Sequence, residues 1–302
     1  MATKHPDPVM LEIMRNRWRG IADEGCAAMI RTSYSPNIKD RYDCSTALAL
    51  PDGQVLAQAE IGTPLHLGIM PSVISSVLHK FPAATIRPGD AIITNLPYPE
   101  GPGHLPDLSM VSAVWHAGNP IVLVATTAHH IDMELFAPGS MPFGVTEIYQ
   151  EGLQVPPTRI IRAGTMDEAI FDLIHQNGRT HNEMHGDLMA QYAAAQAAEQ
   201  RIAELLDRED PALVLQYLHP ILDHAERGMR KGIHELPNGS WTFEDFLDDD
   251  GVTEDPVRIF LTLTVQDDEL IADFTGSSKQ FLGHSMPGSL LPVHACTTRP
   301  RL

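Results

Sequence analysis

A short apolar segment, residues 110–125, carries a cluster of histidine and aspartate at each of its ends. Residues 103–107 (GHLPD) precede the segment and residues 128–132 (AHHID) follow it. A turn signal at residues 117–119 (AGN) divides the segment into two apolar runs, which predicts a β-hairpin. Because the first strand of an antiparallel hairpin starts beside the end of the second, we expect the two clusters to meet at one end of a sheet.

Three side chains of these clusters have the donor atoms of a metal site. His104, Asp107 and His129 supply two imidazoles and one carboxylate, a common ligand set for a divalent cation such as zinc or manganese. Asp43, at the head of an earlier strand pair, is the candidate fourth ligand because a hard-metal site needs a further carboxylate or water. For His104 and Asp107 alone a structural role is the alternative, since loop histidines and aspartates often hydrogen-bond only the backbone.

His130 and Asp132 are the candidate catalytic residues. His130 follows His129 directly, so on an extended strand it faces the opposite side. Asp132 has the same parity as His130, which predicts that its carboxylate orients the imidazole. The alternative for His130 is a structural role in support of the metal ligands.

Other polar residues carry weaker signals. Asn95 and Tyr98 are candidate substrate-binding residues, and the alternative is that they form a turn around the neighbouring prolines. Cys26 and Cys44 lack a nearby histidine and lie in apolar patterns, so we interpret them as buried, unreactive thiols. The acidic run at residues 248–250 is interpreted as a turn, because a calcium loop would need a downstream bidentate glutamate.

The rest of the chain alternates between helical and strand patterns. Apolar residues at helical spacing predict helices over residues 8–32, 70–81 and 166–232, with Pro71 in the first turn of the second helix. Turn signals or alternating apolar residues predict strands over residues 43–57, 91–94 and 257–274. The third helical region is expected to be a long helical hairpin that turns at Asp210 and Pro211. This order predicts an α+β fold with mixed or antiparallel sheets and β-hairpins. The expected regions are 1–165 with the metal site, 166–236 for the helical hairpin, 237–284 for a β-hairpin, and an irregular tail at 285–302.

The composition disfavours several classes of partner. The chain has 302 residues with 21 basic and 39 acidic side chains, and its formal charge of −18 argues against binding to nucleic acid or an anionic membrane. No apolar run approaches the ~20 residues of a transmembrane helix, and no signal-peptide core is present. Three cysteines without a CxxC spacing indicate reduced thiols, so we expect a cytoplasmic protein. Without a GxxxxGK[ST] loop, this chain is not expected to bind ATP alone.

Short motifs in a fixed order carry a family resemblance. They are residues 43–45 (DCS), 58–60 (QAE), 64–68 (PLHLG), 103–107 (GHLPD), 128–130 (AHH), 138–142 (PGSMP), 147–157 (EIYQEGLQVPP), 247–251 (LDDDG) and 273–278 (DFTGSS). The chain thereby resembles the hydantoinase B/oxoprolinase family, which includes the B-type components of N-methylhydantoinases, the C-terminal half of 5-oxoprolinase, and components of acetone and acetophenone carboxylases. The resemblance covers roughly residues 8–284. Leu96 departs from it, because family members usually have an acidic residue there.

Family members continue beyond the point where the resemblance ends, near Gly283. We therefore expect this chain to correspond to the N-terminal part of a B-type subunit, as a fragment or a truncated product. Any active-site residue from the remaining part would then be missing.

The resemblance implies an ATP-dependent system in a hetero-oligomer. In such a system ATP is bound by an A-type partner subunit, which phosphorylates a carbonyl or enol oxygen, and the B-type partner acts on the activated species. The resemblance also implies a divalent metal at His104, Asp107 and His129. Our first interpretation is a cyclic amide hydrolase of the hydantoinase or oxoprolinase type. The alternatives are a subunit of a ketone carboxylase, a non-catalytic assembly partner, and an autonomous metallohydrolase.

Overall fold

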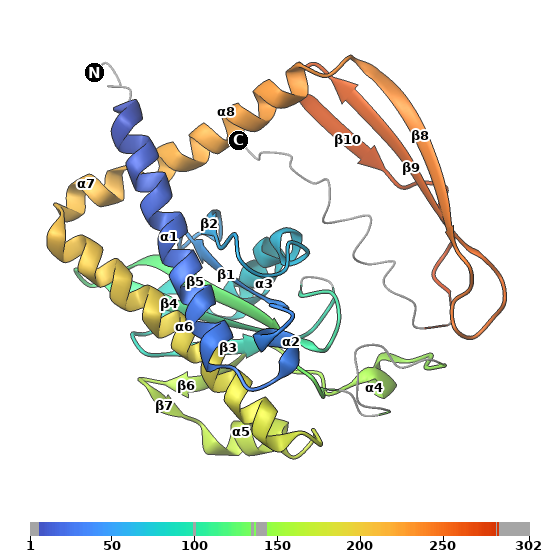
Figure 1. The fold of residues 1–302 in the computed structure, drawn as a ribbon, viewed down its shortest axis with the longest axis horizontal. Coiled ribbons are helices and arrows are strands. Elements are labelled where there is room, and N and C mark those ends of the chain that lie inside the picture. The colour runs from blue at the N-terminus through green and yellow to red at the C-terminus, as the bar shows by residue number, and fades with distance from the viewer. Residues whose placement is uncertain (1–5, 99–100, 134–135, 137–143, 282, 284–302) are drawn as a thin grey trace. The chain divides into compact units, whose positions relative to one another are not determined.

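The computed structural model describes residues 6–98, 101–133, 136, 144–281 and 283, and the chain divides into two compact units (Figure 1). The first unit comprises Met1–Ser140 and Gly152–Leu222, and the second comprises Met141–Glu151 and Asp223–Leu302. Helices and antiparallel strands occur together, so the predicted α+β class is confirmed. Among the described residues, no helix combines the length and the apolar content that a membrane span requires.

A seven-stranded antiparallel sheet forms the centre of the first unit, with the strand order β2-β1-β5-β4-β3-β6-β7. The strands are β1 (Cys44–Ala49), β2 (Val55–Gln58), β3 (Ala91–Thr94), β4 (Asp107–His116), β5 (Asn119–His129), β6 (Thr158–Arg162) and β7 (Thr165–Met166). The predicted hairpin is confirmed as β4 and β5, which are joined at Ala117 and Gly118. Both of these residues have positive φ angles, 48° and 80°, as a tight two-residue hairpin turn requires.

The helices of the first unit cover both faces of this sheet. They are α1 (Pro8–Thr32), α2 (Pro36–Lys39), α3 (His66–Lys80), the 3-10 turn η1 (Ala83–Thr85), α5 (Glu168–His175), α6 (His181–Arg208), α7 (Pro211–Gln216) and the start of α8 (Leu218–His234). Alternation along the strands decides which helix each residue meets. Leu48 and Val124 share a buried cluster with α1 and α6, whereas Ala47 and Ala125 share one with α3.

Helices α1 and α6 run antiparallel to each other across one face of the sheet (Figure 1). Near one end of the pair, Arg17 donates to the Glu209 carboxylate at 2.7 Å. Near the other end, Asp187 of α6 accepts from the backbone N–H of Tyr34 at 2.8 Å. Trp18, the residue after Arg17, is fully buried in the same apolar cluster as residues of α6. The α1–α6 pair is therefore the main helical layer of this unit.

The second unit contains a three-stranded antiparallel sheet with the order β10-β9-β8. Its strands are β8 (Gly239–Leu247), β9 (Val257–Gln266) and β10 (Glu269–Asp273), and it also contains the short helix α4 (Ile148–Glu151). The predicted hairpin of this region is confirmed as β9 and β10. The Asp250 carboxylate accepts from the backbone N–H groups of Val252 and Thr253, which lowers the pKa of Asp250 to about 2. These bonds are those of the predicted acidic turn.

The predicted helical hairpin differs from the structure in its second arm and in the main partner of its first arm. Asp210 does start a new helix, since its side chain accepts from Ala212 N at 3.0 Å and Pro211 occupies the first turn. This helix ends at Gln216, however, so the expected second arm is two helices, α7 and α8. The apolar face of α6 packs mainly against α1, in a cluster that also contains residues of α7 and of the start of α8. Periodicity identifies which face of a helix is buried, but it does not identify the partner.

One boundary prediction was also wrong, and three strands were missed. Helix α3 starts at His66 rather than Met70, which places Pro71 inside the helix. The cost is one missing backbone hydrogen bond close to the helix start. Strands β6, β7 and β8 were not predicted, because β6 and β7 are short and β8 mixes aromatic residues with acidic ones without a clean alternation.

Gly62, in the connection between β2 and α3, provides a test of the backbone that leads to the site. Its φ is +108°, and a Cβ there would collide with the carbonyl oxygen of Cys44. We predict that Gly62→Ala lowers the free energy of unfolding by at least about 1–3 kcal/mol. Gly20→Ala is the control, because Gly20 lies in α1 with no neighbouring atom within 4 Å of the added Cβ. It should raise stability by about 0.5–1 kcal/mol. Equal stability of Gly62→Ala and Gly20→Ala in urea would contradict the predicted collision at Gly62.

Candidate metal centre

The hairpin register brings the two histidine and aspartate clusters together. Asp107, the first residue of β4, pairs directly with His129, the last residue of β5. His104 lies in the turn that leads into β4, where its carbonyl oxygen accepts from Asp107 N at 3.3 Å. The same turn is attached to the end of β5, because Pro106 O accepts from His130 N at 2.9 Å. The predicted convergence at one end of the sheet is confirmed.

One carboxylate oxygen contacts both histidines. Asp107 Oδ1 lies 3.0 Å from His104 Nε2 and 3.1 Å from His129 Nδ1. The two imidazole rings are tilted by 45° with their centroids 5.0 Å apart. Asp107 and His129 are buried, and His104 is the most exposed of the three, at 14% of its side chain. His104 is therefore the ligand candidate that a substrate can approach.

The electrostatics of this cluster favour a negative charge on Asp107. Burial acts to raise the pKa of the Asp107 carboxyl group, but the charge of His104 and the contacts with His104, His129 and His66 outweigh it and hold the pKa well below its usual value. Donor atoms of His104, Asp107 and His129 all lie within 4.8 Å of one another. Two imidazoles around a carboxylate that stays ionised fit a divalent cation.

Asp43, the predicted fourth ligand, lies at the edge of this cluster. Its backbone carbonyl oxygen accepts from His129 N at 3.0 Å, which ties it to the end of β5. Its Oδ1 atom accepts from Thr63 Oγ1 at 2.7 Å. A second contact of Oδ1 is with His66 Nε2, at 3.9 Å. Asp43 is therefore adjacent to the three converging residues, and its role as a ligand remains a prediction.

His66 received no role from the sequence, although it belongs to the 64–68 motif. It is buried at the start of α3, and its Nε2 atom lies 3.6 Å from Asp107 Oδ2. The motif was the available signal, but the predicted helix start at Met70 left His66 in a loop, away from the metal ligands.

His130 faces away from His129, as the strand parity predicted. Its Nε2 atom lies 2.9 Å from Gln191 Oε1 on α6, and the Gln191 amide donates to Leu108 O at 2.8 Å. Gln191 therefore presents its oxygen to His130, so Nε2 carries the hydrogen and Nδ1 has the lone pair. Burial lowers the pKa of His130, and Nδ1 has no hydrogen-bond partner among the described residues. Gln191 was also missed at the level of sequence.

The Asp132 carboxylate has partners other than His130, the residue that it was expected to orient. Its carboxylate accepts from the backbone N–H groups of Arg179 and Thr180 and from the Arg179 guanidinium. The side chain is fully buried and links the chain after β5 to the start of α6. In the described part of the chain, these contacts of Asp132 give no support to an orienting role toward His130. Its catalytic role stays a prediction.

The candidate substrate-binding residues differ in their surroundings. Asn95 is buried, and its amide donates to Leu105 O and Leu153 O at 2.8 Å each and accepts from Val155 N at 2.7 Å. These bonds hold the loop that carries His104, because Leu105 is its neighbour. Tyr98 is 76% exposed. Substrate binding by either residue remains a prediction.

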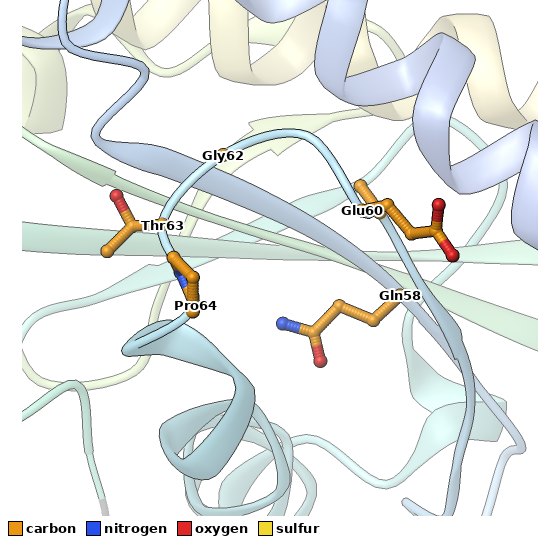
Figure 2. Close-up of a pocket in the computed structure, with 6 residues that line it drawn as sticks. Gln58, Glu60, Gly62, Thr63 and Pro64 are labelled. Atoms are coloured by element: carbon orange, nitrogen blue, oxygen red, sulfur yellow. The ribbon is translucent and has the colours of Figure 1, made fainter.

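The connection between β2 and α3 borders a pocket of about 270 Å³. Figure 2 shows the Gln58 amide pointing across this connection toward Pro64, while the Glu60 carboxylate points away. Glu60 instead accepts from Arg19 at 2.7 Å. Of the residues that line the pocket, Thr63 contacts the candidate centre, because its hydroxyl donates to Asp43. The converging histidines do not line it, so we do not assign the substrate to it.

Cys26 and Cys44 are buried free thiols, with their sulfur atoms 3.9 Å apart. The contact with Cys26 and burial both raise the pKa of Cys44. A thiol that stays protonated in this way is a poor nucleophile. Cys296 and the 138–142 motif lie outside the described residues.

Comparison with known proteins identifies the family. The model of the family described as hydantoinase B/oxoprolinase matches residues 7–286. The B-type component of a putative D-/L-hydantoinase from Pseudomonas sp. is 31% identical over 284 residues, which are 92% of this chain and 48% of that protein. The chain therefore belongs to the hydantoinase B/oxoprolinase family, and it spans about half the length of the first curated relatives that it matches.

Two solved structures have the same fold. The ATP-dependent caprolactamase from Pseudomonas jessenii superposes with a TM-score of 0.83 at 27% identity, over 93% of this chain and 48% of that one. A nucleotide-free structure of acetone carboxylase superposes with a TM-score of 0.84 at 17% identity, over 92% of this chain and 38% of that one. The second likeness, at this lower identity, shows the fold alone.

The contacts of Asp132 predict a structural effect. Asp132→Asn should lower the free energy of unfolding by about 1–3 kcal/mol, because the buried acceptor loses its charge-assisted bonds. Asp172→Asn, at an exposed position of α5, is the matched control and should change stability by less than about 0.5 kcal/mol. Urea unfolding measures both. Unchanged stability of Asp132→Asn, combined with lost turnover, would instead support the predicted catalytic role.

Proposed function

We propose that this chain is the B-type subunit of an ATP-dependent cyclic amide hydrolase. It would hold a divalent cation, zinc or manganese, with His104, Asp107, His129 and Asp43. A partner A-type subunit would bind ATP and activate the cyclic amide by phosphorylation. The observation that carries this proposal is the convergence of two histidines on one buried carboxylate in a member of the hydantoinase B/oxoprolinase family.

The hydrolase is favoured over the ketone carboxylase by the pattern of similarity. The hydantoinase component and the caprolactamase, both named for cyclic amide substrates, are 31% and 27% identical to this chain. Acetone carboxylase is 17% identical and supports only the shared fold. Both reactions need positive charge beside an oxygen atom, so the candidate centre itself does not separate them.

The residues of the centre have distinct tasks in this proposal. Asp107 stays ionised in a buried position and draws His104 and His129 together. When bound, a divalent cation supplies the positive charge that polarises a carbonyl group and lowers the pKa of water. Asp43, the more exposed carboxylate, completes the ligand set. Of the two candidate catalytic residues, His130 has its lone pair at Nδ1 and faces away from His129, and the Asp132 carboxylate holds the backbone at the start of α6.

Metal content tests the centre directly. The purified wild-type chain should contain about one zinc or manganese ion, and His104→Ala or His129→Ala should remove it, because each variant deletes one of three converging ligands. Plasma mass spectrometry measures the metal. The control is His116→Ala, at the opposite end of β4. Full metal content in both ligand variants would refute the site.

The reaction is tested with the partner present. We expect ring opening of 5-oxoproline or a hydantoin, with ADP formed, only when the chain is combined with an A-type subunit and ATP. His104→Ala in the same mixture is the control for contaminating activity. Hydrolysis without ATP would indicate an autonomous metallohydrolase, and bicarbonate-dependent consumption of acetone would indicate a carboxylase. Metal binding without turnover in the complex would indicate a non-catalytic assembly partner.

A further inference from the structure

His66 contacts two carboxylates of the candidate centre at once. It lies outside the three converging ligands, at the start of α3, and only 1% of its side chain is exposed. Its Nε2 atom lies 3.6 Å from Asp107 Oδ2 and 3.9 Å from Asp43 Oδ1. One edge of this imidazole therefore faces the two aspartates that stand at the heads of β4 and β1.

The opposite edge of the ring is anchored in the sheet. His66 Nδ1 lies 3.2 Å from the hydroxyl oxygen of Ser45, a buried residue of β1. The same hydroxyl lies 3.1 Å from the carbonyl oxygen of Thr63. The His66 backbone N–H also donates to Thr63 O at 3.2 Å, so the ring and its backbone are held by neighbouring groups. Its orientation is therefore fixed by contacts outside the candidate centre.

The two carboxylates that face His66 Nε2 decide whether this nitrogen carries a hydrogen. An ionised carboxylate only accepts hydrogen bonds, so a bare nitrogen lone pair that faced two of them would be repelled. Nε2 must therefore present its hydrogen to Asp107 and Asp43. In this tautomer Nδ1 is the acceptor, so the single hydrogen of the Ser45 hydroxyl points to Nδ1. At 3.6 and 3.9 Å these contacts are longer than ordinary hydrogen bonds, and the attraction is mainly electrostatic.

The two oxygens of Asp107 consequently have different partners. Oδ1 contacts His104 and His129 at 3.0 and 3.1 Å, and Oδ2 contacts His66. Asp43 uses Oδ1 for Thr63 and His66, which leaves its Oδ2 available within the described part of the chain. Each carboxylate thus has one oxygen toward His66 and the other for a further partner.

We propose that His66 is a positioning residue that holds the Asp43 and Asp107 carboxylates for one divalent cation. The inference rests on the metal centre of the proposed function. A donor that both carboxylates face restricts the orientation of each of them. Groups that orient the ligands of a metal in this way have large effects on its affinity. This role also explains why a buried histidine belongs to the 64–68 motif.

Metal affinity and a spectrum test the role in the full chain. The Zn²⁺ dissociation constant is measured by competition with a chelating dye, and the visible absorption of bound Co²⁺ reports the ligand geometry. His66→Leu should weaken Zn²⁺ binding by about 10–100-fold and change the Co²⁺ spectrum. His66→Gln should lose less, because its amide can still donate to a carboxylate. The matched control is His79→Gln, at an exposed position of the same helix, which should match wild type in both measurements.

A variant at Ser45 tests the same role of His66 if His66→Leu does not fold. Ser45→Ala removes the anchor of the imidazole with little change in volume, and it should weaken Zn²⁺ binding in the same direction by a smaller factor. Thermal unfolding of the metal-free proteins identifies variants that are folded.

The outcomes separate this inference from the proposed function. Wild-type affinity and spectrum in His66→Gln, Ser45→Ala and folded His66→Leu, with binding lost in His104→Ala, would overturn the role of His66 and leave the centre intact. Absence of stoichiometric Zn²⁺ and Co²⁺ binding by the wild-type chain would overturn both.

Discussion

The structure of the candidate centre depends on one buried carboxylate. Asp107 is 3% exposed, and an ionised carboxylate in that position needs partners to offset the loss of water. Three imidazoles provide them, two on Oδ1 and one on Oδ2. Each comes from a different part of the chain: the turn before β4, the end of β5 and the start of α3. The fold of the first unit can be understood as the arrangement that brings these parts to one carboxylate.

The scaffold fixes each of these parts through backbone contacts. The antiparallel register of β4 and β5 sets Asp107 opposite His129, so a slip of one residue would turn one of the two side chains to the other face. Asn95 holds the loop of His104 through Leu105. Gly62 allows the chain to pass close to Cys44 before it reaches His66. Precise placement of a few polar groups therefore rests on residues that have no metal-binding chemistry themselves.

The sequence was sufficient for the parts of the site that depend on local geometry. A tight hairpin with clusters at both ends predicts that the two clusters meet at one end of the sheet. The direct pairing of Asp107 with His129 also depends on a register shift between Val114 and Trp115, because the turn alone would set Asp107 opposite Ala128. It was insufficient for contacts that depend on packing between distant elements. The main packing partner of helix α6 is α1, and the partner of Asp132 is Arg179 rather than His130. His66 was missed because its contact with Asp107 depends on how α3 lies against the sheet.

Anomalous X-ray scattering from crystals soaked with Zn²⁺ is the most direct measurement of the central claim. Data collected on both sides of the zinc absorption edge locate the ion without reference to activity or to a partner chain. We expect one strong peak bounded by His104, Asp107 and His129, with a carboxylate oxygen of Asp43 next to it. A peak only at other histidines, such as His175 and His181, or none at the end of the β4–β5 hairpin, would contradict the metal centre.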